Sequence, residues 1–312
     1  MIEFSNIKIN DFTSDSIVTI GTFDGVHLGH KKIIESLIHK AQINNLKSVV
    51  LTFFPHPRMV LQKDADIKLI NTLDEKSRIL EQLGLDYLII EKFTEQFSRI
   101  TAVEFVRDIL VNKLNAKQVI IGYNHRFGRN RAANINDLNE FGETFGFKVH
   151  QISAQDIDEV AISSTKIRLA LNEGNIEKAN AYLGYKFMLT GVVTKGKGLG
   201  RTINFPTANL HIEETYKLIP KGGVYTISCN REGKVLYGMM NIGTNPTVDG
   251  TEQSIEINFF DFDEDIYGEK IQVDMLIRLR DERKFESIEV LKQQLLKDKT
   301  SALKFLGQNA SR

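Results

Sequence analysis

The sequence predicts an α/β domain with a parallel sheet, followed by a small antiparallel β-barrel that ends in a helix. Two observations support this prediction. Up to about residue 152, apolar β-branched runs alternate with segments of helical period, which favours parallel strands joined by crossover helices. Beyond residue 184, strand runs follow one another with only Gly, Pro and Asp turns between them, which favours an antiparallel barrel.

The elements of the first part follow from their hydrophobic period. Strands are expected at residues 17–23, 48–54, 86–91, 117–123 and 147–152. Helices are expected at residues 31–41, 74–84, 101–114 and 135–146. Thr101 and Glu104 have the spacing of a capping box, and Gly84 is placed to end the second helix. Ligands of an open α/β sheet bind beyond the carboxyl ends of its strands, so TFDGVHLGH, FPHPR and GYNHRFGRNR are expected at one edge.

The second part begins with a helical pair over residues 162–184. Strands are then expected at residues 187–193, 224–230, 235–243, 254–260 and 271–280, and an amphipathic helix at residues 288–298. We place the domain boundary near Gly184, which gives domains at residues 1–184 and 185–312.

Charge and composition limit the partners of the chain. Of its 312 residues, Lys+Arg and Asp+Glu number 40 each, so the formal net charge is +0. No bulk field exists to attract nucleic acid or an anionic membrane, and any phosphate binding must be local. The single cysteine, Cys229, excludes an internal disulfide and a thiolate metal cluster, and we expect it to be buried on a strand. No run has signal-peptide or membrane-spanning character, so we expect a cytoplasmic protein.

The string IVTIGTFDGVHLGH, residues 17–30, has the build of a phosphate site. The apolar run breaks at Gly21, turns through Asp24 and Gly25, and places His27 and His30 at the start of a helical segment. Gly25 and Gly29 leave room for a polyphosphate, while free amides at a helix N-terminus and two imidazoles can donate to its oxygens. The alternative is a plain strand–turn–helix crossing whose histidines cap the helix or face solvent.

The segment ISSTKIR, residues 162–168, adds hydroxyl and cationic groups. Ser163 or Ser164 can cap the following helix, and Ser164, Thr165 and Arg168 lie one turn apart, where they can point at one anion. The alternative is an ordinary N-capped basic helix.

The barrel part carries a glycine-rich run, KGKGLGRTINFPTANL, at residues 195–210. No helix follows Gly196, Gly198 and Gly200, which excludes the dinucleotide-binding fingerprint and leaves a glycine-rich surface loop as the default. Thr207 and Asn209 alternate on an extended segment, so they present two neutral oxygens to one side. Such oxygens suit Mg²⁺ that is already bound to ATP.

One carboxylate stands out on the strand SIEINFF. Alternation places Ile255, Ile257 and Phe259 on one face and Glu256 on the other. Glu256 is our candidate general base, and the alternative is an exposed strand glutamate. Asp261, Asp263 and Asp265 have the spacing of a calcium loop, but Ile266 and Gln272 occupy positions that need Gly and Glu, so we expect a solvated hairpin turn.

These motifs resemble those of a known family. TFDGVHLGH resembles the GxFDGxHxGH motif of the nucleotidyltransferase superfamily, and ISSTKIR resembles the ISSTxIR motif of FAD synthetases. The glycine-rich run with FPTAN closely resembles the GxGxGR…PTAN motif of riboflavin kinases. The resemblance spans nearly the whole chain and is to the bacterial bifunctional riboflavin kinase/FMN adenylyltransferases, also called FAD synthetases. It implies a Rossmann-like nucleotidyltransferase domain followed by a barrel of the riboflavin kinase type.

The resemblance implies two ATP-dependent reactions. Riboflavin and ATP would give FMN and ADP in the barrel, and FMN and ATP would give FAD and pyrophosphate in the first domain, with Mg²⁺ serving both steps. The FMN phosphate is already ionised and needs no general base, whereas the ribityl hydroxyl needs one. The expected partners are riboflavin, FMN, FAD and ATP, with no nucleic acid or membrane, and we expect a monomer or weak homo-oligomer.

The resemblance also assigns residue roles. His27 and His30 would contact ATP phosphates, Ser164, Thr165 and Arg168 would hold the leaving pyrophosphate, and Glu256 matches the family's catalytic glutamate. Further nucleotide contacts are expected from Gly21, Phe23, Asp24, Gly25, Gly29, Ser163, Gly196, Gly198, Gly200 and Arg201. For Asp24, the alternative role is to shape the turn. Metal ligands are expected at Thr207 and Asn209, and flavin contacts at Pro55, Pro57, Asn124, Arg126, Phe127 and Arg280. Arg278 is the alternative to Arg280, because both belong to the segment that resembles the family's C-terminal flavin region.

The flavin segment departs from the family pattern, GxDFxFGxxRxG. His125 follows Asn124, and Ala132 and Ala133 stand where a glycine is common, which leaves details of flavin binding open. Phe127 has the alternative role of plugging the end of the sheet.

Two rival functions remain open at this point. One is another small-molecule nucleotidyltransferase with an appended barrel, which FPTAN together with Glu256 disfavours. The other is a non-catalytic flavin-binding regulator or store. The complete set of candidate catalytic residues disfavours that reading, since binding alone needs no base.

Overall fold

The computed structural model describes two compact units, Met1–Ser164 and Thr165–Arg312. The described residues are 1–5, 12–62, 66–122, 125–152, 162–195, 205–247 and 250–310. The predictions for Asn124, Gly196, Gly198, Gly200 and Arg201 lie outside the described residues.

The first unit contains a parallel sheet of six strands in the order β1-β4-β3-β2-β5-β6. Its strands are β1 (Ile2–Ser5), β2 (Ser16–Ile20), β3 (Lys47–Phe54), β4 (Tyr87–Lys92), β5 (Ala116–Gly122) and β6 (Lys148–Ile152). The five strands predicted from the alternating pattern are all present, and the predicted α/β class is confirmed. The edge strand β1 was not predicted, because four residues are too few to show a period.

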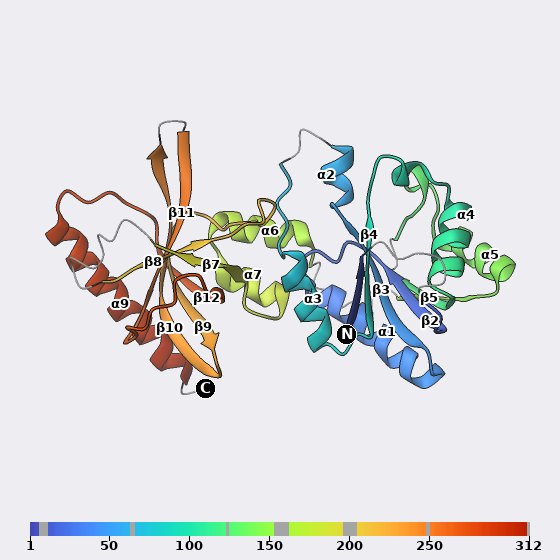
Figure 1. Ribbon diagram of the computed structural model, residues 1–312, viewed down its shortest axis with the longest axis horizontal. Helices are drawn as coiled ribbons and strands as arrows, with labels where there is room; N and C mark the ends of the chain where they lie inside the picture. The colour runs from blue at the N-terminus through green and yellow to red at the C-terminus, as the bar shows by residue number, and fades with distance from the viewer. Residues whose placement is uncertain are drawn as a thin grey trace. The chain divides into compact units, whose positions relative to one another are not determined.

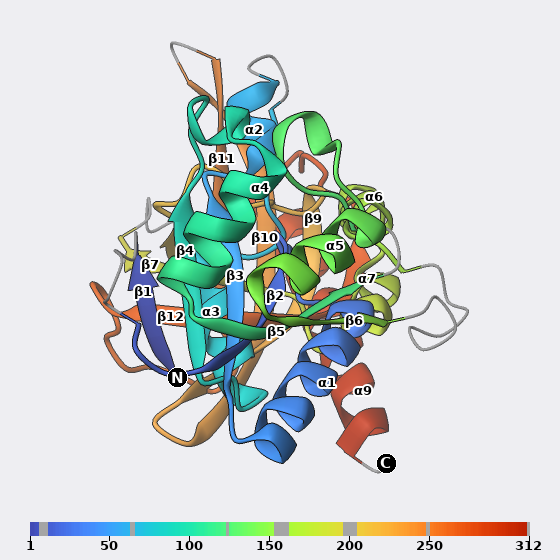
Figure 2. The ribbon, with the colours of Figure 1, turned by 90° about the vertical axis from the view of Figure 1, so that its right-hand side faces the viewer.

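Helices cover the sheet of the first unit. The helical elements are α1 (Leu28–Asn44), α2 (Pro57–Leu61), α3 (Leu73–Gln82), η1 (Phe97–Arg99), α4 (Ala102–Glu104), its π-helical continuation η2 (Phe105–Lys113), η3 (Arg129–Arg131) and α5 (Ile135–Phe145). Figure 1 shows α3 and α4 on opposite sides of the sheet, and Figure 2 shows α4 and α5 in front of the strands. Alternate residues of the strands, such as Val18, Leu51 and Val119, join one core with Phe105 and Leu138.

The predicted capping box at Thr101 is present. The Thr101 hydroxyl accepts from the Glu104 amide at 3.3 Å, and the Glu104 carboxylate accepts from the Thr101 amide at 2.7 Å. This reciprocal pair satisfies amides that have no partner within the helix, so the helix begins where the spacing predicted.

The second unit contains a closed antiparallel barrel in the order β10-β11-β8-β7-β12-β9 (Figure 1). The strands are β7 (Met188–Thr194), β8 (Ala208–His211), β9 (Gly223–Arg231), β10 (Lys234–Thr247), β11 (Gly250–Phe259) and β12 (Lys270–Arg280). Helix α9 (Ile288–Ala310) packs against the outside of the barrel, where Ala302 joins a core with Val224 and Met239. The predicted barrel with a terminal helix is confirmed.

The helical pair α6 (Ser164–Glu173) and α7 (Ile176–Leu183) packs on the barrel from Thr165 onward. Asn180 on α7 donates to the Met275 carbonyl at 2.9 Å and accepts from the Phe187 amide at 2.7 Å. The compact units therefore divide between Ser164 and Thr165, after the first residue of α6. The domain boundary near Gly184 stays a prediction.

Two smaller expectations concern burial and membranes. Cys229 is buried on β9, as predicted, and burial raises the pKa of its thiol to about 11. Within the described ranges, no helix has the length and apolar character that crossing a membrane requires. The cytoplasmic location and the oligomeric state stay predictions.

Candidate active sites

The turn between β2 and α1 has a backbone that few sequences adopt. Phe23, Gly25 and Val26 have φ angles of 44°, 84° and 30°. A Cβ on Gly25 would lie 2.9 Å from Cδ1 of Ile70, so both backbone and packing require glycine there. Gly21 lies under the Phe23 ring, and Gly29 is buried within α1. The role of these glycines in clearing space for a polyphosphate stays a prediction.

Asp24 is a buried organiser of this turn. Its side chain is 2% exposed, and Oδ1 accepts from the backbone amides of Ile70 at 2.9 Å and Asn71 at 3.5 Å. The backbone carbonyl of Asp24 accepts from the Ser164 hydroxyl at 2.9 Å. The structure therefore brings the first residue of α6 to the turn, although 140 residues separate the two in sequence.

His27 and His30 lie together at the N-terminus of α1. Their rings stack with centroids 3.6 Å apart, and the edge of Phe23 meets His30 at 5.2 Å. His27 is the N-cap, and its Nδ1 accepts from the His30 amide at 3.4 Å. Since Nδ1 accepts, the proton of a neutral His27 ring is assigned to Nε2, which makes Nε2 a donor.

Both imidazoles are neutral at neutral pH. Burial lowers the pKa of His27 to about 4. Burial also lowers the pKa of His30 well below its ordinary value, and the nearby His27 and Lys76 lower it further. Nδ1 of His30 is buried without a hydrogen-bond partner. The pair therefore offers N–H donors, and not a fixed positive charge, to an anion at the helix end.

The remaining residues of the ISSTKIR segment divide between the units. Ser163 and Ser164 belong to the first unit, while Thr165 and Arg168 belong to the second. On α6, Thr165 is exposed and Arg168 is half-buried, with the buried Ile167 between them. The joint action of Ser164, Thr165 and Arg168 on one anion stays a prediction.

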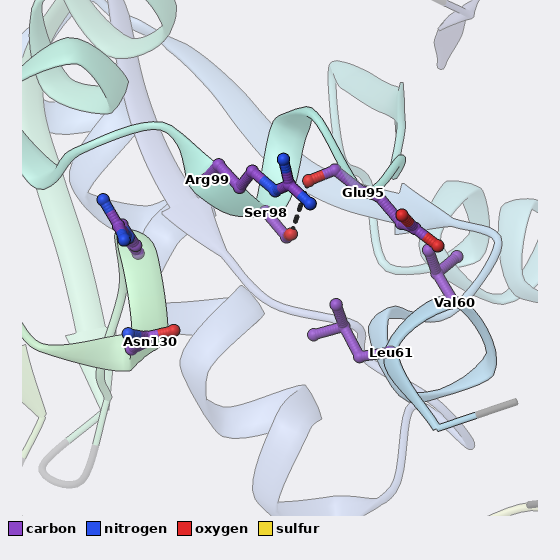
Figure 3. A pocket seen from close by; sticks show the side chains of 7 residues that line it. Val60, Leu61, Glu95, Ser98, Arg99 and Asn130 are labelled. Carbon is purple, nitrogen blue, oxygen red and sulfur yellow. Dashed lines mark hydrogen bonds between the residues drawn. The ribbon is translucent and has the colours of Figure 1, made fainter.

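A hollow of about 790 Å³ lies beside α2, and we call it the α2 pocket. It is lined by Val60, Leu61, Glu95, Ser98, Arg99, Arg129 and Asn130. Figure 3 shows Val60 and Leu61 on α2, with Glu95, Ser98 and Arg99 across from them and Asn130 on a third segment. The segments that follow FPHPR and RFG therefore line one pocket with an apolar side and two arginines.

The described flavin candidates of the first unit are not among the residues that line this pocket. Pro55 follows a cis peptide bond, and Pro57 is the first residue of α2. Arg126 is exposed. Phe127 is 6% exposed, and its ring centroid lies 5.9 Å from that of Phe105 in the core. This position matches the alternative role of plugging the end of the sheet.

In the barrel, Glu256 lies between two asparagines on neighbouring strands. It is paired with Asn209 on β8 and with Asn241 on β10. Directly opposed residues of antiparallel strands point to the same face, so the three side chains form a row. We call Asn209, Glu256 and Asn241 the glutamate row. Glu256 is half-buried, while Ile255 and Ile257 are buried, as the predicted alternation requires.

The glutamate row lies on the barrel face that α9 covers. Asn241 is also opposed by Val224, and Val224 belongs to the core formed with α9. Asn258, two residues beyond Glu256, donates to the Pro206 carbonyl at 2.8 Å and so holds the segment before Thr207 against β11. Asn241 and Asn258 were not named from the sequence, because only strand register shows which residues stand beside Glu256.

Arg280 is engaged with α9. Its Nε and Nη2 donate to the Asp298 carboxylate at 2.9 and 2.8 Å, and the two side chains are 18% and 4% exposed. Arg278 instead donates to the Gly222 carbonyl and pairs with Asp281 at 2.8 Å. Contact of Arg280 with flavin stays a prediction, and its present partner gives it a structural role.

The fold and these sites define a class of protein: a nucleotide-transferring α/β domain joined to a barrel with a separate polar site. A family model described as FAD synthetase matches residues 9–166, and one described as riboflavin kinase matches residues 183–306. The bifunctional riboflavin kinase/FMN adenylyltransferase of Escherichia coli K12 is 37% identical over 292 residues, with 93% of each chain covered. The Bacillus subtilis 168 protein of the same name is 36% identical over 305 residues, covering 96% of this chain and 95% of that one.

A solved structure is similar over nearly the whole chain. The crystal structure of a Streptococcus pneumoniae protein named as a macrolide-efflux protein has a TM-score of 0.88 at 33% identity. It covers 97% of this chain and 99% of that one. Taken together, the comparisons show that the chain belongs to the bifunctional riboflavin kinase/FMN adenylyltransferase family, and the predicted enzyme class and function are confirmed.

Proposed function

We propose that the two reactions are divided between the two units, with FMN adenylylation at the β2–α1 turn and riboflavin phosphorylation at the glutamate row. One contrast supports this division. The described turn offers neutral N–H donors, and its carboxylate, Asp24, is buried against backbone amides, whereas the barrel offers one half-buried carboxylate between two amides. The N–H donors of the turn suit an acceptor that is already charged, and the carboxylate of the barrel suits an alcohol.

In adenylyl transfer, an FMN phosphate oxygen attacks the α-phosphorus of ATP while the bond to the departing pyrophosphate breaks. No proton has to move at neutral pH. His27 Nε2, the His30 ring and the amides of Leu28 and Gly29 at the start of α1 donate to phosphate oxygens as negative charge moves onto the leaving group. Ser163, Ser164, Thr165 and Arg168 complete the phosphate contacts, and Asp24 holds the turn in shape.

In phosphoryl transfer, the ribityl hydroxyl must lose its proton as it attacks the γ-phosphorus. Glu256 accepts that proton, the new P–O bond forms, and the bond to ADP breaks. Asn241 stands on the side of Glu256 opposite to Asn209, so it can orient the carboxylate or the incoming hydroxyl. The glycine-rich run with Arg201 supplies contacts to ATP phosphates.

Magnesium fits the barrel site by its chemistry. Mg²⁺ prefers oxygen ligands and is usually held by few protein groups together with substrate phosphates. The Thr207 hydroxyl and the Asn209 amide oxygen are such ligands, and strand register places Asn209 directly beside Glu256. Bound there with ATP, Mg²⁺ would neutralise charge on the transferring phosphate.

The α2 pocket is our proposed site for FMN in the first unit. Its volume of about 790 Å³ suits a ligand of this size, Val60 and Leu61 give an apolar wall, and Arg99 and Arg129 can pair with phosphate. The flavin contacts that the family resemblance implies for Pro55, Pro57, Asn124, Arg126 and Phe127 are part of this proposal.

Two variants test the division. Glu256→Ala should abolish FMN formation from riboflavin and leave FAD formation from supplied FMN intact, because only the first reaction needs a base. His30→Ala should do the reverse. Products are separated chromatographically over time with riboflavin or FMN, ATP and Mg²⁺. Loss of both activities in either variant, with circular dichroism unchanged, would contradict the division.

A further inference from the structure

A fully buried lysine lies beneath the turn that carries the two histidines. Lys76 is 3% exposed, and its Nζ donates to the Thr22 carbonyl at 2.7 Å. Burying an ammonium group is unfavourable unless charge and hydrogen bonds compensate for lost water. A lysine retained at such a position therefore calls for a reason beyond packing, since methionine would fill similar space.

The position of Lys76 is set by its own helix. Thr72 and Glu75 form the capping box of α3. The Thr72 amide donates to the Glu75 carboxylate at 3.0 Å, and the Glu75 amide donates to the Thr72 hydroxyl at 3.1 Å. Lys76 is the next residue, so the cap fixes the point from which its side chain starts. Helix α3 thus places the Lys76 ammonium group against the Thr22 carbonyl of the turn.

Two buried groups of opposite charge hold the turn from both sides. Lys76 binds the Thr22 carbonyl, and Asp24, which is 2% exposed, accepts from the amides of Ile70 and Asn71. Burial lowers the pKa of Lys76, and the nearby Asp24 carboxylate partly offsets that lowering. Between these two anchors lies Phe23, with its φ angle of 44°, and its ring meets His30. The anchors therefore stabilise a backbone that would otherwise relax.

We propose that Lys76 is a positioning residue for adenylyl transfer, which holds the Thr22–Asp24 backbone so that His27 and His30 present their N–H donors to the triphosphate. The proposal rests on the proposed phosphate role of the histidines. Lys76 does not touch substrate in this account. It acts through the Thr22 carbonyl and through its charge, which disfavours protonation of His30. Besides Lys76, the charged or titratable group that lowers the pKa of His30 is His27, while Asp24 acts on Lys76.

The test compares Lys76→Met, which keeps bulk but removes charge and donors, with Lys76→Arg, which keeps both. Lys76→Met should lower kcat/KM for FAD formation from FMN and ATP roughly ten- to hundredfold, the range for losing a hydrogen bond to a charged group. Lys76→Arg should retain more activity. Riboflavin kinase activity, measured in the same sample, should stay at the wild-type level.

A second readout separates positioning from general stability. Removing the positive charge should raise the pKa of His30, which is measured from the NMR shift of its Cε1 proton as the pH is varied. A loss of stability alone would leave the His30 pKa unchanged. Lys117→Met is the matched control, because the Lys117 side chain is 47% exposed and pairs at the surface with Asp15. The control should keep both activities and the His30 titration.

Each outcome decides. The proposal would be overturned by a folded Lys76→Met protein whose kcat/KM for FAD formation is within twofold of wild type and whose His30 pKa is unchanged. Should that variant unfold, the wild-type protein is observed by ¹⁵N NMR of lysine side chains: a protected Lys76 ammonium at pH 7 supports the anchor, and a neutral amine overturns it. His30→Ala is run in parallel, since retained FAD formation in that variant would instead contradict the phosphate role of the histidines.

Discussion

In the first unit, the two candidate histidines come from one tight turn, whereas in the second unit the candidate base and its two asparagine neighbours come from three neighbouring strands. His27 and His30 are three residues apart, and burial makes them neutral. Asn209, Glu256 and Asn241 are distant in sequence and meet through antiparallel register. The turn depends on buried anchors and an unusual backbone, while the row depends on the barrel and on the helix that covers it.

This difference matches the chemistry of the two acceptors. An ionised phosphate needs donors that are held still, and a turn anchored by Asp24 and Lys76 provides them. An alcohol needs a base that can take and release a proton, which favours a carboxylate that keeps some access to solvent. Perturbing the anchors should therefore affect one reaction, and perturbing the barrel face should affect the other.

The largest effect is expected from Asp298→Ala. This change leaves Arg280 without its buried carboxylate, and breaking a buried pair costs about 3–5 kcal/mol. The free energy of unfolding of the barrel should fall by that order, with loss of kinase activity. Urea unfolding and both enzyme assays check it. An unchanged unfolding midpoint with only a raised KM for riboflavin would instead assign Arg280 to flavin binding.

The pH dependence of stability tests the burial of the histidine pair. The folded pKa of His27 is about 4 and its ordinary value is 6.5, so between these values the unfolded chain binds a proton that the folded chain does not. The contribution of His27 to the free energy of unfolding is therefore fully present above pH 6.5. It falls by about 2–3 kcal/mol as the pH approaches 4.

Urea unfolding of wild type and His27→Gln at pH 7 and pH 5 measures this contribution. The variant should lose less stability on acidification. His125, whose pKa is also about 4 because of burial, acts in the same direction in both proteins and cancels from the comparison. Equal losses in the two proteins would show that His27 is not desolvated.

Gly25→Ala tests the backbone of the turn. The φ angle of 84° and the contact with Ile70 at 2.9 Å should together cost about 1–3 kcal/mol and displace the histidines. FAD formation should fall while FMN formation stays unchanged. Gly146→Ala is a matched control, because its φ is 77° but nothing lies within 4 Å of the added Cβ. Equal effects of the two variants on FAD formation would contradict a local role for Gly25.

The smallest effect is expected in the α2 pocket. Arg99→Ala should raise the KM for FMN about tenfold by removing one ion pair to phosphate, with little change in kcat. Steady-state kinetics with varied FMN check this, and kinase kinetics serve as the internal control. An unchanged KM would exclude Arg99 from the FMN site.

Local pattern was enough to predict much of this molecule. The strands 17–23 and 48–54 were predicted because alternation and apolar runs are properties of short segments, and the Thr101 cap needs a spacing of only three residues. The motif around His27 and His30 and the carboxylate Glu256 could be named for the same reason.

Three-dimensional packing was needed for the rest. No short window shows that Lys76 reaches Thr22, that Ser164 meets Asp24, that Asn241 stands beside Glu256, or that Arg280 pairs with Asp298. Each of these contacts joins residues from different elements, and its energy depends on burial and on strand register. Sequence period reports which side of an element is apolar, whereas the partner on the other side appears only when the chain has folded.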